Sequence, residues 1–213
     1  MLSVRYGRKE PEAGCDEAGR GCLAGPVFAA AVIFAPDYRN DRLNDSKKLG
    51  EKERYSLREE IERDALSYAV ARVEAEEIDR INILQASIKA MHLALARLNP
   101  QPAFITVDGN RFHPYGKIPH VCVVKGDGRY LSIAAASILA KTYRDDCMKE
   151  LSLRYPCYAW DKNKGYPTAA HYRAIEQNGV CPLHRRSFRL YPEQDLFSAI
   201  EKTIDKEKEN NEK

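Results

Sequence analysis

The order of its short apolar runs constrains the fold of this chain more than any other feature. Two strand-sized runs come first, one ending at Gly14-Cys15-Asp16 and one spanning residues 27–34, and the glycine-rich stretch 19–26 joins them. Beyond residue 50, further strand-sized runs alternate with longer stretches of helical spacing. Two adjacent strands, followed by strands interleaved with helices, predict a mixed α/β sheet rather than an all-parallel one.

Hydrophobic period and breaker residues predict the remaining elements. Strands are expected at residues 66–73, 103–108 and 121–124. Helices are expected at about residues 52–63, 75–98 and 132–154, and after Thr168 and Pro192. We therefore expect a core over residues 1–155, a C-terminal helical part of the same domain over residues 156–205, and a disordered tail over residues 206–213.

The composition is typical of a soluble globular protein. Of the 213 residues, 44% are hydrophobic and 31% are charged, which suits one large domain with its own core. The six cysteines include no C-x-x-C pair, which argues against a zinc cluster, and free thiols suit a reducing cytosol. The chain shows no apolar signal segment and no run as long as a membrane span. We expect a cytoplasmic monomer without membrane contact.

Four acidic residues lie at the ends of predicted strands or in the turns just beyond them: Asp16, Glu17, Asp108 and Asp127. Strand ends of an α/β sheet converge on one crevice, so these side chains could meet there. Carboxylates without His or Cys select hard cations such as Mg²⁺ or Mn²⁺. Two such ions can activate water and stabilise the leaving oxygen in phosphodiester hydrolysis. The alternative is that each acid is a turn former or a helix cap.

Two features complicate this acidic set. Adjacent residues of a regular strand point to opposite faces, so Asp16 and Glu17 can act together only if the chain turns there, and the glycines that follow make such a turn plausible. Asp145, in the predicted helix 132–154, competes with Asp127 for the fourth position, although a local salt bridge explains Asp145 more simply.

The net charge of +3 alone predicts nothing about nucleic acid, but the charge is unevenly distributed. Residues 161–190 contain six Lys or Arg residues and two acids. This segment could form a phosphate-binding face or a solvated helical surface, and charge alone leaves both open.

A series of motifs resembles the signature of ribonuclease HII, the type 2 ribonuclease H. The first is Gly14-Cys15-Asp16-Glu17-Ala18-Gly19-Arg20-Gly21, with Ala24-Gly25-Pro26-Val27 behind it. The others follow in the order of that family: Asp45-Ser46-Lys47-Lys48-Leu49, Val107-Asp108-Gly109, Lys125-Gly126-Asp127, Ser132-Ile133-Ala134-Ala135-Ala136-Ser137-Ile138, Ala140-Lys141, Arg144-Asp145, Gly165-Tyr166-Pro167-Thr168 with His171, and His184-Arg185-Arg186-Ser187-Phe188. The blocks span residues 14–188, and such an ordered series is highly specific.

The resemblance implies a ribonuclease H-like mixed five-stranded sheet with flanking helices and a C-terminal helical extension. It implies Mg²⁺ or Mn²⁺ as cofactor, with these catalytic residues as ligands: Asp16, Glu17, Asp108 and Asp127. The implied activity is an endonuclease that hydrolyses the RNA strand of RNA–DNA hybrids. The implied substrates include duplex DNA with a single ribonucleotide, cut 5′ to that ribonucleotide to leave a 3′-hydroxyl and a 5′-phosphate.

The resemblance also implies substrate-binding residues. Gly19-Arg20-Gly21 matches the element that senses the 2′-hydroxyl, the group that distinguishes RNA from DNA. Tyr166 matches the tyrosine that packs on the sugar after the cut site. Four basic residues are expected to track phosphates: Lys47, Lys48, Arg185 and Arg186. The alternatives are a surface ion pair for Arg20, a core position for Tyr166, and solvated charges for the two late arginines.

Two other functions compete with this reading. A non-catalytic hybrid-binding protein would keep the fold with its acids as remnants, but all four acids are present. A nucleotide-binding enzyme would use stretch 19–26 as a phosphate cradle, but that stretch fits neither G-x-G-x-x-G nor G-x-x-x-x-G-K-[ST]. Fifteen residues precede Asp16, so we expect type 2 rather than the type 3 relatives, which carry an additional N-terminal domain. Cys22 stands where proline is common in the family.

Overall fold

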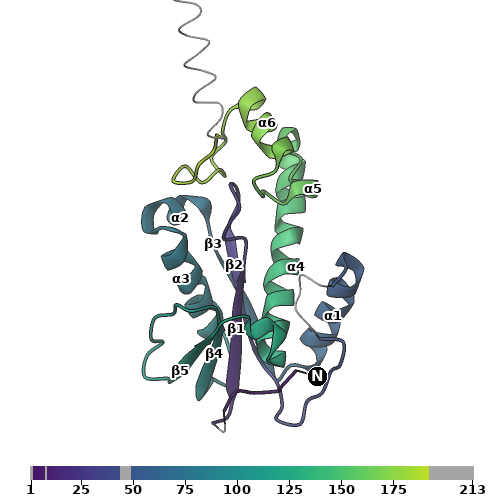
Figure 1. Cartoon of the computed structure of the whole chain (residues 1–213), viewed down its shortest axis with the longest axis vertical. Helices are drawn as coiled ribbons and strands as arrows, with labels where there is room; N and C mark the ends of the chain where they lie inside the picture. Colours follow the sequence, from purple (N-terminus) through teal and green to yellow (C-terminus); the bar gives the residue numbers. More distant parts are fainter. Residues whose placement is uncertain (1, 8, 44–48, 192–213) are drawn as a thin grey trace, which may run out of the picture.

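The structure is a computed structural model that describes residues 2–7, 9–43 and 49–191. Its centre is a five-stranded sheet with the strand order β3-β2-β1-β4-β5 (Figure 1). The strands are β1 (Glu12–Ala18), β2 (Val27–Ile33), β3 (Ser67–Val73), β4 (Phe104–Asp108) and β5 (His120–Val123). β2 runs antiparallel to β1 and β3, whereas β4 is parallel to both β1 and β5. The predicted mixed five-stranded sheet is confirmed.

Helices cover both faces of this sheet. α2 (Ala75–Ile81) and α3 (Ile83–Leu95) lie on one face, and α1 (Glu51–Asp64) and α4 (Leu131–Arg154) lie on the other (Figure 1). Along β2, Ala29 and Ala31 pack in the core beneath α3, whereas Ala30 packs in the core beneath α1 and α4. Because side chains alternate between faces along a strand, a strand covered on both sides has to be apolar throughout.

The start of α4 lies directly against β1. A Cβ atom at Gly14 would be only 2.4 Å from the backbone carbonyl carbon of Ser132, so no other residue fits there without a shift. Small residues open α4, and Ala134, Ala135 and Ala136 among them are fully buried. The small-residue start therefore allows α4 to approach the central strand, and this close approach brings Ser137 to the cavity that Asp16 lines.

The helix predicted over residues 75–98 is two helices, which corrects the sequence-based expectation. α2 ends and α3 begins at Asn82, whose φ of 66° lies in the left-handed region. The Asn82 side chain accepts hydrogen bonds from the backbone amides of Leu84 (3.0 Å) and Gln85 (3.1 Å). Asparagine tolerates this backbone and caps the new helix, so the break leaves the apolar spacing on either side unchanged.

The described C-terminal part consists of the short η2 (Pro156–Tyr158), α5 (Trp160–Asn163) and α6 (Ala169–Asn178). Thr168 caps α6, because its hydroxyl accepts a hydrogen bond from the backbone amide of His171 at 3.2 Å. An apolar cluster joins this part to the rest of the chain through Leu23 and Met148. We propose on this basis that both parts form one domain. The stretch after Pro192 and the tail 206–213 lie outside the described residues.

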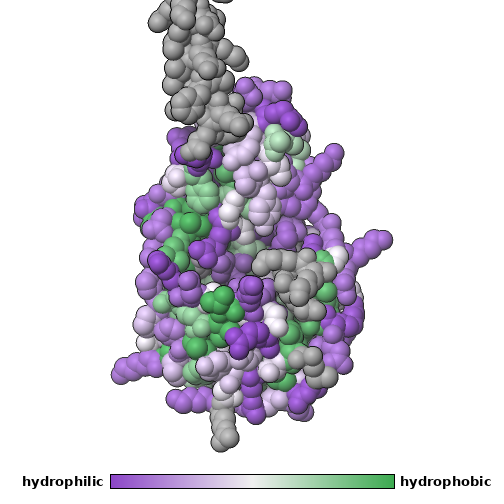
Figure 2. All heavy atoms as spheres, in the orientation of Figure 1, coloured by the Kyte–Doolittle hydropathy of each residue, from purple (hydrophilic) through white to green (hydrophobic). Residues whose placement is uncertain are grey.

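The surface is mixed in character. On the face drawn in Figure 2, hydrophobic patches alternate with hydrophilic side chains over the whole described part. Within residues 2–7, 9–43 and 49–191, none of the helices combines the length and the apolar character that a membrane crossing requires.

Candidate active site

Three of the four predicted carboxylates lie at one edge of the sheet. β1 and β4 are parallel neighbours, and their last pair is Cys15 with Val107, so Asp16 and Asp108 follow directly after it. Asp16, Glu17 and Asp108 all line one cavity of about 210 Å³. The same end of two adjacent parallel strands therefore brings together side chains that are far apart in the sequence.

The chain does not turn between Asp16 and Glu17, which corrects one condition of the sequence analysis. Both residues belong to β1 and pair with β2, and the backbone first departs from the strand at Gly19, where φ is +95°. A second cavity of about 150 Å³, bordered by Ser87 of α3, shares Glu17 and Asp108 with the first. The two cavities meet at the strand ends, and this allows neighbours on opposite faces of β1 to border one site.

The electrostatics of Asp16 reflect this crowding. Burial raises the pKa of Asp16 well above its ordinary value, and the negative charges of Glu17 and Asp108 raise it further. Hydrogen bonds from the Ser137 hydroxyl and the Glu17 backbone amide oppose the shift. The site thus concentrates negative potential in a partly buried position, which favours a bound cation.

Each of the three carboxylates contacts a donor of the protein. Asp16 Oδ1 accepts from the Glu17 amide at 2.7 Å, and Asp108 Oδ1 accepts from the Gly126 amide at 2.7 Å. Glu17 Oε1 lies 3.1 Å from Arg20 Nη1. Among the described residues, no group of three or more His, Cys, Asp or Glu side chains is arranged so that it could hold a metal ion. The fit to a hard cation therefore rests on the oxygen-only donor set and on the crowding of negative charge.

Asp127 lies beside this group rather than within it. It belongs to the short helix η1 (Gly126–Gly128) and is 4% exposed. Its neighbour Gly126 is the residue whose amide contacts Asp108. The described residues that line the 210 Å³ cavity do not include Asp127. The rival Asp145 is buried and forms an ion pair with Lys141 at 2.5 Å, one helical turn away. This pair is the local salt bridge that the sequence favoured for Asp145.

The segment 19–26, which we call the glycine loop, connects β1 to β2. Gly19 is sterically required, because its φ is +95° and a Cβ atom there would lie 2.0 Å from Arg144 Nε. Gly21 has no atom within 4 Å of such a Cβ, so local packing does not require glycine at this position. The Arg20 side chain is 50% exposed and contacts Glu17 at the cavity rim. Arg20 thus does form an ion pair, and its partner is a predicted site residue.

Arg185 is placed differently from its predicted role on phosphates. It is 0% exposed, and its guanidinium donates to the carbonyl oxygens of Gly25 (2.9 Å), Gly19 (2.8 Å) and Arg20 (3.0 Å). Arg185 lies behind the glycine loop, where a phosphate cannot reach it, so both readings of the sequence, phosphate contact and solvated charge, need correction. Arg186 is exposed.

The glycine loop has a second buried arginine, which the sequence analysis did not assign. Arg144 of α4 is 0% exposed and donates to the carbonyl oxygens of Pro26 (3.1 Å), Ala24 (3.2 Å) and Lys164 (2.9 Å). Two buried guanidiniums thus hold the carbonyls of one loop. Lys47 and Lys48, also predicted to bind phosphates, lie outside the described residues.

Tyr166 lies at the same cavity as the carboxylates and is 37% exposed, which excludes the core position that the sequence left open. Lys141 Nζ lies 5.7 Å from the centre of its ring. Ser137 and Lys141, four residues apart on α4, also line the cavity, as does Arg54 of α1. None of these three residues had a predicted role, although the spacing of Ser137 and Lys141 places them on one face of a helix.

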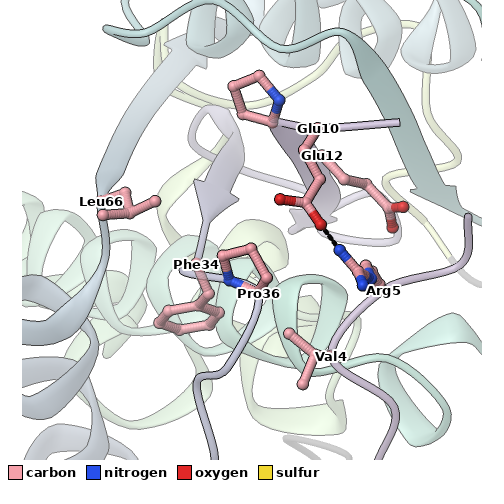
Figure 3. A pocket seen from close by; sticks show the side chains of 8 residues that line it. Val4, Arg5, Glu10, Glu12, Phe34, Pro36 and Leu66 are labelled. Carbon is pink, nitrogen blue, oxygen red and sulfur yellow. Dashed lines mark ion pairs between the residues drawn. The ribbon is translucent and has the colours of Figure 1, made fainter. Parts of the chain in front are cut away.

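A third cavity, of about 240 Å³, lies near the N-terminal segment (Figure 3). Val4, Phe34, Pro36 and Leu66 give it an apolar wall, and Arg5 and Glu10 form an ion pair at its rim (Figure 3). Its lining includes none of the predicted site residues. Its two carboxylates are already engaged, Glu10 by Arg5 and Glu12 by backbone amides, so we place the chemistry at the sheet edge.

A mixed sheet whose parallel strands β1 and β4 end in crowded carboxylates, beside a half-exposed tyrosine, defines a nuclease of the ribonuclease H-like class. A family model described as Ribonuclease HII matches residues 13–191. The chain belongs to the ribonuclease HII family, endoribonucleases that cleave the RNA of RNA–DNA hybrids.

Relatives agree with this assignment. A ribonuclease HII from Parabacteroides distasonis is 64% identical over 183 residues, which cover 86% of this chain and 92% of the relative. A ribonuclease HII from Bacteroides fragilis is 61% identical over 185 residues, or 87% of this chain and 92% of the relative. These identities extend over nearly the whole length of both relatives.

Solved structures share the fold. Ribonuclease H2 from Pyrococcus horikoshii OT3 superposes with a TM-score of 0.69 at 26% identity, covering 84% of this chain and 94% of that one. The ribonuclease HII of Archaeoglobus fulgidus, solved as a complex with PCNA, gives a TM-score of 0.70 at 26% identity, covering 85% and 96%. Bst-RNase HIII, solved with Mn²⁺, gives 0.63 at 19% identity, covering 89% and 68%.

Proposed function

We propose that this protein hydrolyses the RNA strand of RNA–DNA hybrids and also cleaves duplex DNA on the 5′ side of a single embedded ribonucleotide, leaving 3′-hydroxyl and 5′-phosphate ends. The observation that carries the proposal is the meeting of Asp16, Glu17 and Asp108 in one cavity with Tyr166 at its side. Carboxylates serve the chemistry of phosphodiester hydrolysis, and an aromatic ring beside them offers a flat face to a sugar.

We further propose that Asp16, Glu17 and Asp108 hold Mg²⁺ or Mn²⁺, with Asp127 as the adjacent fourth ligand. Oxygen-only ligands and the crowding that raises the pKa of Asp16 support this assignment. The solved Mn²⁺ complex of Bst-RNase HIII is consistent with it. When bound, such an ion polarises the phosphate and lowers the pKa of a coordinated water.

The residues of the chain divide the remaining tasks. In the proposal, the glycine loop presents backbone groups to the 2′-hydroxyl, because Arg20 and its neighbours lie at the cavity rim. Tyr166 receives the sugar on the far side of the cut. Lys141, whose Nζ is paired with Asp145 at 2.5 Å, adds positive charge where a phosphate would enter. Recognition of the sugar and placement of the scissile phosphate thus come from different residues around one cavity.

Cleavage mapping on matched duplexes tests this proposal. Four duplexes of one sequence differ in one labelled strand, which is all DNA, contains one ribonucleotide, contains four ribonucleotides, or is all RNA. Products are sized after incubation with Mg²⁺ or Mn²⁺. The proposal requires cleavage 5′ to the single ribonucleotide and none in the all-DNA duplex. Asp16→Asn is the inactive control for a contaminating nuclease. Cleavage of the all-RNA strand without cleavage at the single ribonucleotide would reduce the function to hybrid hydrolysis alone.

A further inference from the structure

The C-terminal part buries two histidines that the proposed chemistry does not use. His171 of α6 is 0% exposed and His184 is 1% exposed. Trp160 and Tyr158 pack around them, with the Tyr158 and His184 ring centres 4.7 Å apart. Buried imidazoles require specific hydrogen-bond partners, so their contacts show what each ring nitrogen does.

Three contacts of fixed direction determine the protonation of both rings. Trp160 Nε1, which can only donate, lies 3.0 Å from His171 Nε2, and the Tyr166 carbonyl oxygen, which can only accept, lies 3.0 Å from His171 Nδ1. His171 therefore carries its proton on Nδ1. The Cys181 backbone amide donates to His184 Nδ1 at 3.0 Å. His184 therefore carries its proton on Nε2.

The two rings then form a directional chain. His184 Nε2–H donates to His171 Nε2 across 3.3 Å, and His171 Nδ1–H donates to the carbonyl oxygen of Tyr166. A second proton on His171 would face the N–H groups of Trp160 and His184. The neutral state suits the site: burial, together with the neighbouring His171, lowers the pKa of His184 to about 4, and burial also lowers the pKa of His171.

This chain of hydrogen bonds connects the two parts of the proposed recognition site, Tyr166 and the glycine loop. At one end it holds the Tyr166 carbonyl, which also accepts from the Thr168 amide at 2.8 Å. At the other end, the backbone of His184 forms an antiparallel bridge with Ala24 of the glycine loop. The Leu183 carbonyl accepts from the Gly25 amide at 2.9 Å in the same bridge. The buried rings therefore join Tyr166 to the glycine loop, in addition to the direct bond from the Leu23 amide to the Gly165 carbonyl at 2.8 Å.

We propose that His171 and His184 are positioning residues that fix Tyr166 relative to the glycine loop and so set the preference for a single ribonucleotide in duplex DNA. The inference rests on the role of Tyr166 in the proposed function. Neither histidine touches the substrate in this scheme; both act through the Tyr166 backbone.

Two variants of His171, each of which reproduces one ring nitrogen, separate this role from a purely structural one. In His171→Asn, the amide nitrogen takes the place of Nδ1 and keeps the donor to Tyr166, while the acceptor for Trp160 is lost. In His171→Gln, the terminal oxygen takes the place of Nε2 and keeps the acceptor for Trp160, while the donor to Tyr166 is lost. Each variant thus removes the hydrogen bonds of one ring nitrogen and keeps those of the other.

The readout is a specificity ratio: kcat/KM on a duplex with one ribonucleotide divided by kcat/KM on a duplex with an all-RNA strand. We expect His171→Gln to lower this ratio about fivefold, the size of one neutral hydrogen bond. His171→Asn keeps the bond to Tyr166 but loses the bond from His184, so it should lower the ratio by less, about twofold, as should His184→Asn. Trp160 is the only tryptophan of the chain, so its fluorescence shows whether the buried cluster is intact in each variant. An equal fall in both variants, or an unchanged ratio in His171→Gln, overturns the proposal.

Tyr166→Ala separates failure of this inference from failure of the proposed function. If Tyr166→Ala leaves the ratio unchanged, the role of Tyr166 itself is wrong. If Tyr166→Ala lowers the ratio and His171→Gln does not, the inference alone is wrong. In the double variant, His171→Gln should add no further fall to that of Tyr166→Ala. If His171→Gln does not fold, His184→Asn replaces it: it keeps the acceptor for Cys181 and loses the donor to His171, and an unchanged ratio there overturns the inference.

Discussion

At the sheet edge, Asp16 and Asp108 are positioned by regular backbone, since each continues a strand whose last pair is fixed by sheet hydrogen bonds. The glycine loop has no such ladder along its whole length. Besides the short backbone bridge between Ala24 and His184, buried side chains hold it: Arg144 and Arg185 donate to its carbonyl oxygens. The sheet alone thus places these two proposed catalytic residues, whereas the glycine loop depends on buried side chains for which we propose no contact with the substrate.

This difference predicts opposite costs of mutation. A carboxylate at the edge can be removed without loss of a structural contact other than its own hydrogen bond, so the effect falls on turnover. A buried arginine that serves several carbonyls cannot be removed without leaving those groups unsatisfied, so the effect falls on stability first.

Asp108→Asn should lower kcat by more than about a thousandfold while the affinity for a hybrid stays within about threefold, because the change removes a charge from the edge and no phosphate contact. Stability should not fall, since the charge of Asp108 adds to the repulsion on Asp16. Single-turnover kinetics, hybrid binding and urea denaturation measure the three quantities. Asp41→Asn, at an exposed acid, is the matched control. Full activity in Asp108→Asn would remove Asp108 from the catalytic group.

Arg185→Met and Arg186→Met form a pair of neighbours that tests the other side of the contrast. Arg185→Met removes the guanidinium donor from the carbonyls of Gly25, Gly19 and Arg20, and among the described residues only the long 3.4 Å bond from the Cys22 amide to Gly19 remains. The free energy of unfolding should therefore fall by about 3 kcal/mol. Arg186 is exposed, and its replacement should change that free energy by less than about 0.5 kcal/mol. Urea denaturation of both variants gives the comparison. Equal changes would mean that Arg185 does not hold the loop.

The buried arginines also show where sequence reasoning ends. Residues 161–190 contain more positive than negative charge, but charge does not reveal whether a guanidinium faces solvent or a ring of carbonyls. Strand β2 was predictable because a strand buried on both faces has to be apolar throughout. The break at Asn82 was not predictable, because a single capping residue leaves the apolar spacing intact. The arginines act on backbone that is distant in the sequence, and Asn82 acts on two amides in the first turn of the helix that it caps; the spacing of apolar residues encodes neither.

The carboxylates were predictable for a related reason. Parallel neighbouring strands end at the same edge, so Asp16 and Asp108 meet once both strands are recognised. Glu17 was expected to join them only if the chain turned between Asp16 and Glu17, and it does not turn there. The geometry instead uses two cavities that share Glu17 and Asp108, and that arrangement depends on how α3 and α4 pack on opposite faces.

Gly19→Ala and Gly21→Ala should differ although both lie in the Gly-Arg-Gly motif. A methyl group at Gly19 meets Arg144 and requires a strained backbone, so the free energy of unfolding should fall by about 2 kcal/mol. A methyl group at Gly21 meets open space, and stability should change by less than about 0.5 kcal/mol. Thermal or urea unfolding measures both. A loss of single-ribonucleotide cleavage in the stable Gly21→Ala variant would place its glycine in substrate contact, and comparable destabilisation would contradict the packing argument.

The smallest expected effect is a pH dependence confined to the buried ring pair. The pKa of His184 is about 4 in the folded protein and 6.5 in an ordinary setting, with His171 and Cys181 facing the ring. Above pH 6.5 both states are neutral and the stability contribution is complete; as the pH falls below 6.5, the unfolded chain takes up a proton that the folded ring refuses, so stability decreases towards pH 4. Between pH 7 and pH 5.5, wild type should lose about 1 kcal/mol more than His184→Asn, because other titrating groups contribute equally to both proteins. Parallel curves of stability against pH for the two proteins would mean that His184 does not remain neutral. The direction of the hydrogen bonds from His184 to Tyr166 would then not be fixed.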